Sequence, residues 1–338
     1  MDDYEIFEPG DCVLQSGATL PRVRLAYKTH GTLNADKSNA IVFPTHYGGR
    51  HPENEWLIGP GKALDPTTHF IIVPNMLGNG YSSSPSNTPP PYDRAAFPHV
   101  TIYDNVALQH RLVAEHFGIT HLPLVLGFSM GAQQTYQWAV SYPGEVDRII
   151  PICGSAKTSP HNWVFLEGVT AALRADAAWR DGWYDEQPVR GIRALARVWA
   201  GWGHSQAFYR ELIHLKLGYA SLEDFIVRAY EEDNLRFDAN DLLAMAWTWQ
   251  HADIGATPGF DGNFERALGS IKARALVMPC TTDLYFPPED SAYEVQHIPG
   301  AELRPIHSIW GHTAGAGVDP ADAAFIQQSV REWLAAPI

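Results

Sequence analysis

The segment from Gly127 to Gly131 constrains the fold of this chain more than any other stretch. It reads Gly-Phe-Ser-Met-Gly and joins an apolar run, 122–126, to a helix-like run, 132–140. A strand that turns at once into a helix bends so sharply that a Cβ at either flanking position would clash, so glycine is used there. Ser129 between them presents its hydroxyl at a helix N-terminus, where N–H groups and the helix dipole stabilise negative charge. The flanking strand and helix favour a nucleophilic serine over a Gly/Ser turn without chemistry.

Size and charge narrow the class of protein. The 338 residues, 45% of them hydrophobic, suit one large domain with an insertion, or two domains. The net charge of −14 argues against nucleic acid and anionic membranes as partners. No apolar stretch approaches the roughly 18 residues that a membrane span needs, and the acidic N-terminus shows no secretory signal.

The cysteines and histidines predict neither disulfides nor a metal centre. Cys12, Cys153 and Cys280 are far apart and odd in number, which is typical of reduced, buried thiols in a cytoplasmic protein. The chain contains no Cys-x-x-Cys pair and no His-Glu-x-x-His run. We therefore expect a cytoplasmic protein that uses no metal and no cofactor.

Apolar runs alternate with helical patterns along most of the chain. This alternation predicts an α/β protein, with a mostly parallel sheet flanked by helices on both faces. An antiparallel hairpin over 12–14 and 23–29 is expected first, with Ser16 and Gly17 near its turn. The expected strands that follow lie at residues 40–44, 69–74, 122–126, 147–153, 274–278 and 302–306.

The middle of the chain, residues 159–263, has a different pattern. Strand-like runs vanish there, long helical patterns take over, and seven of the eleven tryptophans fall in it. We interpret this segment as a helical lid domain inserted into a core domain made of residues 1–158 and 264–338. The alternative is a helical subdomain that does not touch the site. Insertions that cover the substrate are where such folds place specificity, which favours the lid.

A serine hydroxyl becomes a good nucleophile only when a base takes its proton and an acid orients the base. In strand–turn–helix sites of this kind, the acid and then the base follow the serine along the chain. Asp283 comes just after the strand expected at 274–278, although an aspartate there can also be a plain turn residue. His312 lies between the last strand and the last helix, with His307 as its main competitor. We predict a triad of Ser129, Asp283 and His312.

An attacked carbonyl develops an oxyanion that needs two backbone N–H donors. The first is expected from Met130, directly after the nucleophile. The second should come from the loop after an early strand, at residues 45–50, which contains a Gly-Gly pair as lipase loops do. We predict Tyr47 as this donor, with Gly48 next.

Several stretches resemble the homoserine acetyltransferase family of α/β hydrolases. They are residues 31–36, 58–65, 129–131, 138–143, 286–288 and 311–312. They span nearly the whole chain, so the resemblance implies the α/β-hydrolase fold and assigns Ser129, Asp283 and His312 to the triad. It also implies a homodimer formed through the helical lid.

The departures from that family bear on the substrate. Transacetylases have a second glycine before the serine, where this chain has Phe128, and an aspartate after the catalytic histidine, where it has Thr313. Their carboxylate-binding Arg matches Arg197, but His204 replaces the Tyr that follows it. Without the aspartate, a buried ammonium group would lack its ion pair. Arg197 and Phe128 are the candidate substrate-binding residues, and Arg197 could equally be structural.

Residues 77–85 and 152–162 resemble family members that act as esterases. The resemblance therefore implies a serine carboxylester hydrolase that cleaves short-chain esters, acetates first, with a small-molecule ester as its substrate and a second copy of the chain as its protein partner. The main alternative is a CoA-dependent O-acetyltransferase acting on homoserine, serine or another alcohol through the same acyl-enzyme. A binding protein without activity on the same scaffold is the remaining alternative.

Overall fold

One twisted sheet organises the molecule, whose computed structural model describes residues 3–337. Its eight strands follow the order β1-β2-β4-β3-β5-β6-β7-β8. β1 pairs antiparallel with β2, and β2 antiparallel with β4, whereas all other neighbours are parallel. The strands are β1 Glu5–Val13, β2 Thr19–His30, β3 Ala40–Val42, β4 Phe70–Pro74, β5 Leu124–Phe128, β6 Arg148–Ile152, β7 Arg274–Val277 and β8 Glu302–Leu303.

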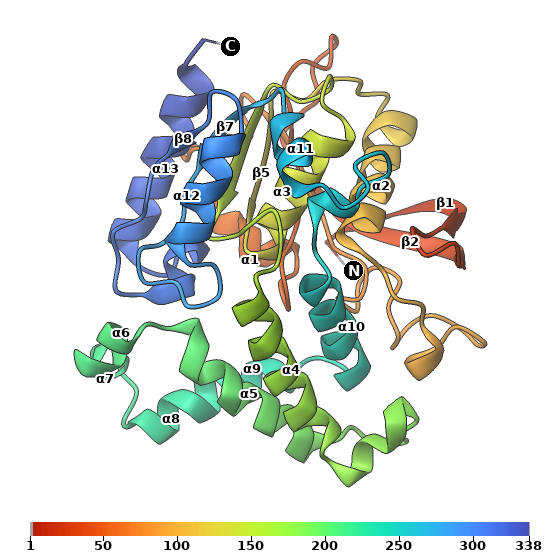
Figure 1. Ribbon diagram of the computed structural model, residues 1–338, viewed down its shortest axis with the longest axis vertical. Coiled ribbons are helices and arrows are strands. Elements are labelled where there is room, and N and C mark those ends of the chain that lie inside the picture. Colours follow the sequence, from red (N-terminus) through yellow and green to blue (C-terminus); the bar gives the residue numbers. More distant parts are fainter. Residues whose placement is uncertain (1–2, 338) are drawn as a thin grey trace.

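Helices cover both faces of this sheet (Figure 1). The α-helices of the described residues are α1 His51–Asn54, α2 Ile102–Arg111, α3 Met130–Ser141, α4 Pro160–Arg174, α5 Val189–Gly203, α6 Gln206–Arg210, α7 Ile213–Lys216, α8 Leu222–Ile226, α9 Glu232–Asn234, α10 Ala239–Gln250, α11 Phe264–Gly269, α12 Pro288–His297 and α13 Pro320–Ala335, of which α4 to α10 lie below the sheet and not on its faces. Val125 of β5 packs in one apolar cluster with α2, α3, α11 and α12, whereas Leu124 and Leu126 pack in another with α13. All residues of β4, β5 and β6 are buried, as expected for strands covered on both sides.

The sequence predicted the sheet well in its centre and less well at its edges. β1 begins at Glu5 rather than near residue 12, because most of its side chains lie at an exposed edge and carry no continuous apolar run. The last strand was predicted to be too long. β8 spans only Glu302–Leu303, and Ile306 makes a single bridge to Cys280.

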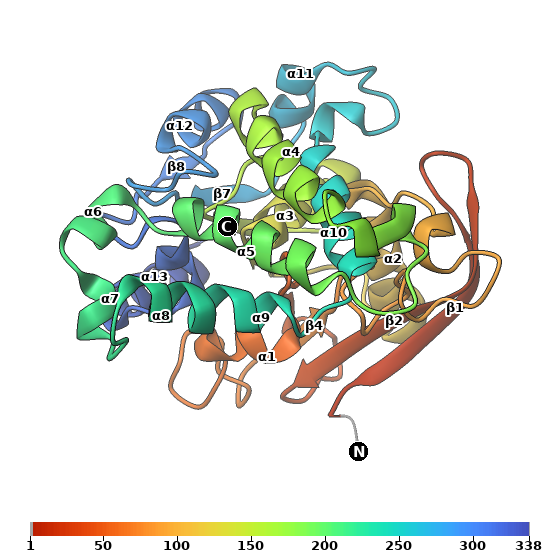
Figure 2. The same ribbon diagram turned by 90° about the horizontal axis from the view of Figure 1, so that it is seen from below.

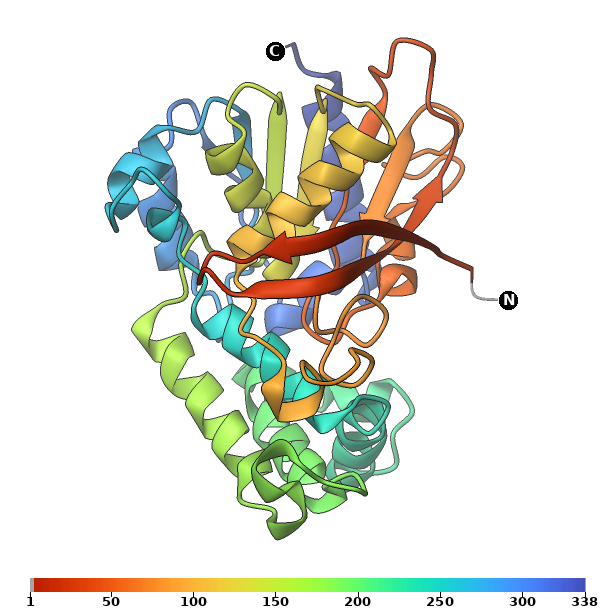
Figure 3. The same ribbon diagram turned by 90° about the vertical axis from the view of Figure 1, so that its right-hand side faces the viewer.

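The helices α4 to α10 gather below one end of the sheet, between β6 and β7 in the chain (Figures 1 and 3). Seen from below, α4, α5 and α10 lie across the core helix α3 (Figure 2). Aromatic side chains of these helices share one buried cluster with Met76 and Met130 of the core. The inserted helices therefore cover the sheet end where α3 begins.

Candidate active site

The turn between β5 and α3 has the geometry that its glycines predicted. Ser129 has positive φ, with φ 57° and ψ −124°. A Cβ on Gly127 would lie 2.2 Å from the carbonyl group of Gly131, and a Cβ on Gly131 would lie 2.7 Å from the carbonyl oxygen of Pro44. Either contact would push the chain apart, so both glycines are sterically required. The Ser129 hydroxyl is thereby presented at the N-terminus of α3.

The structure brings Ser129, His312 and Asp283 together. Nε2 of His312 lies 2.8 Å from Ser129 Oγ, and Nδ1 lies 2.7 Å from Asp283 Oδ2. The other Asp283 oxygen accepts the backbone N–H groups of Tyr285 at 2.8 Å and Phe286 at 3.2 Å. A carboxylate held in this way accepts a hydrogen bond from Nδ1–H, which keeps the proton on Nδ1 and leaves Nε2 free to accept the serine proton.

His312, and not its competitor His307, reaches the serine. His307 is exposed, whereas the chain after it turns inward at Gly311, where φ is 64°. The N–H of Gly311 donates to Oγ1 of Thr282, next to Asp283, at 3.1 Å. This bond ties the histidine loop to the aspartate loop, so the two triad side chains approach from neighbouring strand ends.

Two N–H groups beside Ser129 are available to an oxyanion. Within residues 3–337 neither Met130 nor Tyr47 donates its backbone N–H to an acceptor, and the same holds for Gly48. The close approach of Gly131 to Pro44 seats the loop of Tyr47 against the start of α3. Met130 and Tyr47 therefore remain the predicted donors, with Gly48 as the alternative for the second.

Aromatic side chains from the core and from the inserted helices enclose the triad. The ring centroid of Tyr285 lies 4.8 Å from that of His312, and Phe165 of α4 lies 4.9 Å from Tyr285. Trp199 of α5 stacks on Tyr47 at 4.5 Å. The inserted helices thus contribute rings to the surroundings of the triad. For Trp199 the only signal in the sequence was the abundance of tryptophan in 159–263, since nothing there showed which rings face inward.

The triad is closed off from bulk solvent. Ser129 is 3% exposed, Asp283 4% and His312 8%. His46, next to Tyr47, is neutral at pH 7, because burial and the nearby His312 lower its pKa to about 4. Its ring lies 4.9 Å from that of Phe128. The sequence did not single out His46, which reveals itself only through this packing.

The two candidate substrate-binding residues take other places. The Arg197 guanidinium pairs with Glu231 at 2.5 Å and with Glu223, which accepts from its Nη1 at 3.1 Å. These contacts lie within the inserted helices and favour the structural interpretation of Arg197. Phe128 packs its ring 4.7 Å from that of His312, so it supports the imidazole and forms part of the site wall.

A metal-binding cluster and a membrane-spanning helix are both missing from the part of the chain that the structure describes. It contains no group of three His, Cys, Asp or Glu side chains placed to hold a metal ion. Among the same residues, no helix combines the length and apolarity that crossing a bilayer requires.

Comparisons with known proteins agree with this fold. A family described as the alpha/beta hydrolase fold matches residues 47–312. The ethyl acetate hydrolase of Pseudomonas veronii is 41% identical over 337 residues, covering 99% of this chain and 96% of that protein. The crystal structure of an acetylester hydrolase from Corynebacterium glutamicum superposes with a TM-score of 0.95 at 39% identity, covering 98% of this chain and 96% of that one. The homoserine O-acetyltransferase of Chlorobaculum tepidum is 33% identical, covering 93% of this chain and 90% of that protein.

The sheet order and the serine turn define a hydrolase of the α/β class, and the chain belongs to the α/β-hydrolase family. Within that family, its identity to the two esterases exceeds its identity to the homoserine O-acetyltransferase. The resemblance to the esterase branch of the homoserine acetyltransferase family is therefore confirmed.

Proposed function

We propose that this chain is a serine carboxylester hydrolase that cleaves short-chain esters, acetates first. The observation that carries the proposal is the continuous hydrogen-bonded series from Ser129 Oγ through His312 to Asp283. The similarity to an ethyl acetate hydrolase and to an acetylester hydrolase supports it.

In the proposed reaction, Ser129 attacks the ester carbonyl while His312 Nε2 accepts its proton. Asp283 holds the tautomer and stabilises the imidazolium, and the Met130 and Tyr47 N–H groups donate to the oxyanion. His312 then protonates the departing alcohol. A water molecule, deprotonated by the same histidine, attacks the acyl-enzyme and releases the acid.

The aromatic enclosure supports a small acyl group. Phe128, Tyr285 and Phe286 all pack against the His312 ring, with centroids 4.7 to 5.6 Å away. A long acyl chain would have to displace these buried rings, at the cost of lost core packing. An acetyl group carries a single methyl beyond the carbonyl and makes the least demand on this wall.

The test is acetate release from ethyl acetate, without CoA or an added acceptor. Ser129→Ala should lower kcat by a factor on the order of 10⁶, a barrier change of roughly 8 kcal/mol. Ser329→Ala, at a buried serine of α13, is the matched control and should keep wild-type turnover. A Ser129→Ala protein that keeps more than a few per cent of activity would falsify the assignment.

The second candidate is a CoA-dependent O-acetyltransferase, favoured by the identity to a homoserine O-acetyltransferase. Two features weigh against an amino-acid acceptor. Arg197 is already neutralised by two glutamates. Thr313, where transacetylases have an aspartate, brings no charge, and its hydroxyl donates to the Trp310 carbonyl. Sustained ester turnover without an acceptor supports the hydrolase, whereas a single burst that stalls supports the transferase.

We also propose that the protein is cytoplasmic, that it forms a homodimer, and that residues 159–263 form its lid domain. Four leucine side chains, each more than two fifths exposed, support an apolar contact surface near α6–α8. They are Leu212, Leu215, Leu217 and Leu222. Light scattering of the purified protein and of a Leu215→Asp/Leu217→Asp variant tests the dimer, which should dissociate in the variant. Cell fractionation tests the location.

A further inference from the structure

Side-chain amides hold the backbone of the loop that carries Tyr47. Gln134 Nε2 donates to the carbonyl oxygen of Thr45 at 2.8 Å, and Asn54 Nδ2 donates to that of Phe43 at 2.9 Å. Asn79 Nδ2 donates to the carbonyl oxygen of Gly49 at 3.2 Å. All three amides are at most 2% exposed. Buried carboxamides cost free energy unless they are bonded, so these contacts restrict the loop strongly.

Gln134 is the amide that links this loop to the nucleophile helix. It lies on the second turn of α3, and Nε2 also donates to the carbonyl oxygen of Met130 at 3.1 Å. One carboxamide therefore contacts both segments that carry the predicted oxyanion donors, Met130 and Tyr47. The distance between those segments sets the separation of the two N–H groups, which must converge on one oxygen.

Two further residues fix the orientation of the Gln134 amide. Its Oε1 accepts Nε2 of Gln109 at 2.6 Å, and Gln109 Oε1 accepts the indole N–H of Trp138 at 2.9 Å. An indole N–H can only donate, so the Gln109 oxygen must face it and the Gln109 NH₂ group must face Gln134. A flipped Gln134 would then direct its oxygen at the Thr45 carbonyl. The series Trp138–Gln109–Gln134 thus has one satisfied arrangement.

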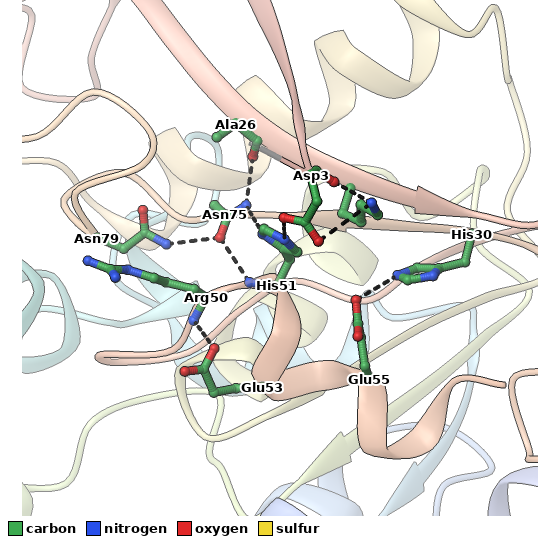
Figure 4. Close-up of polar contacts among 10 residues, drawn as sticks. Asp3, Ala26, His30, Arg50, His51, Glu53, Glu55, Asn75 and Asn79 are labelled. Atoms are coloured by element: carbon green, nitrogen blue, oxygen red, sulfur yellow. Dashed lines mark hydrogen bonds and ion pairs between the residues drawn. The ribbon is translucent and has the colours of Figure 1, made fainter. Parts of the chain in front are cut away.

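The far end of the loop is anchored by a separate network (Figure 4). Asn75 Oδ1 accepts the backbone N–H of His51 at 3.0 Å and Nδ2 of Asn79 at 3.2 Å. His51 reaches on to Asp3, with Nε2 and Oδ1 2.9 Å apart. This network holds residues 49–51, and Asn54 holds Phe43 at the start of the loop, whereas Gln134 bonds Thr45 directly to α3.

We propose that Gln134, oriented by Gln109 and Trp138, is a positioning residue for the oxyanion hole. The inference rests on the proposed ester hydrolysis and names the group that aligns its two N–H donors. The Gln134 amide is bonded to protein groups through both Nε2 and Oε1. It acts by keeping the 45–47 segment at the distance from α3 that lets both N–H groups reach a tetrahedral oxyanion. The carbonyl of a bound ester depends less on that distance, so the effect should fall on kcat more than on KM.

The test compares Gln134→Met with Gln137→Met on the same helix. Gln137 is 2% exposed and donates to Ser141 Oγ and Thr257 Oγ1, both at 2.8 Å and neither in the loop. Both variants remove a buried amide of equal size, so their stability losses should be similar. We expect Gln134→Met to lower kcat on ethyl acetate by about 10- to 100-fold with KM changed less than about threefold. Gln137→Met should keep kcat within about threefold of wild type.

A second readout uses a phosphonate that labels Ser129, because its tetrahedral oxygen occupies the oxyanion hole. The labelling rate should fall by the same factor in Gln134→Met and not in Gln137→Met. Equal kcat and labelling rates in the two variants, or a change in KM alone, would overturn the inference. If Gln134→Met does not fold, Trp138→Phe decides, since it removes the orienting N–H, along with part of the buried ring, and leaves Gln134 in place. Lower kcat in Trp138→Phe supports the series, and an unchanged kcat refutes it.

The two proposals fail in different ways. If the wild-type protein does not turn over esters, the proposed function is wrong. The ratio of phosphonate labelling rates between Gln134→Met and Gln137→Met would still test the role of Gln134. A wild-type protein that turns over esters, with Gln134→Met equally fast, would end only the inference.

Discussion

Replacing Asp283 with Asn should reverse the tautomer of His312. Oδ1 of Asp283 accepts two backbone N–H groups, from Tyr285 and Phe286, so the oxygen of an asparagine amide must take that position. Its NH₂ group then faces Nδ1 of His312, where Oδ2 now lies at 2.7 Å. Nδ1 must become an acceptor, which moves the imidazole proton to Nε2. The nitrogen 2.8 Å from Ser129 Oγ then donates and can no longer act as a base.

The loss of the base should lower kcat by a factor on the order of 10⁴, or about 5.5 kcal/mol of barrier. The assay is initial-rate hydrolysis of p-nitrophenyl acetate at neutral pH, alongside the thermal unfolding midpoint of each variant. Asp322→Asn is the control, because Asp322 is also buried but is not hydrogen-bonded to the triad. Its Oδ2 accepts the Ser308 hydroxyl at 2.6 Å. An Asp283→Asn protein within tenfold of wild type, while folded, would show that His312 does not depend on this carboxylate.

Three other changes test the rest of the structure. Gly131→Ala places a Cβ 2.7 Å from the Pro44 carbonyl oxygen, so it should lower stability by about 1–3 kcal/mol and lower kcat. Gly144→Ala, with no heavy atom within 4 Å of its Cβ, should change neither, and comparison of Tm values decides. Burial raises the pKa of Glu294 to about 8, above the roughly 4.3 of an unfolded chain, so native protein binds a proton that unfolded chain releases. The free energy of unfolding that this proton contributes is therefore full below about pH 4.3 and is lost as pH rises through 8. The Tm of Glu294→Gln should accordingly rise relative to that of wild type as pH increases from 5 to 8. Arg197→Ala should leave kcat/KM on ethyl acetate within about twofold, since its partners are two glutamates of the inserted helices. A large rise in KM would instead make Arg197 a substrate ligand.

The residues around the serine turn could be predicted because their constraints are local. The clash that forces glycine at 127 is with the carbonyl group of Gly131, four residues on, and the pattern of strand, turn and helix is visible in any short window. Gly131 belongs to the same short pattern, although its own clash is with the distant Pro44. The order of Ser129, Asp283 and His312 follows from which strand ends carry them. The core strands were recognisable for the same reason, since burial on both faces gives continuous apolar runs.

Contacts between distant segments could not be predicted in this way. Gln134 and Thr45 are 89 residues apart, and a buried glutamine on a helix gives no sign of the carbonyl it will meet. His312 was predicted over His307, but the sequence did not show the cause, which is the inward turn of the chain at Gly311. The pairing of Arg197 with Glu231 joins two helices whose packing no periodicity specifies.

The burial of Ser129 sets how an acyl group on this serine can be released. Ser129 is only 3% exposed, and Trp199 of the inserted helices stacks on Tyr47 of the loop packed against α3. In the proposed mechanism, water and a second alcohol would compete for the same acyl-enzyme, so the balance between hydrolysis and transfer would depend on how readily water enters this enclosure. A substitution at Trp199, which belongs to no catalytic group, should then shift the partition between the two products.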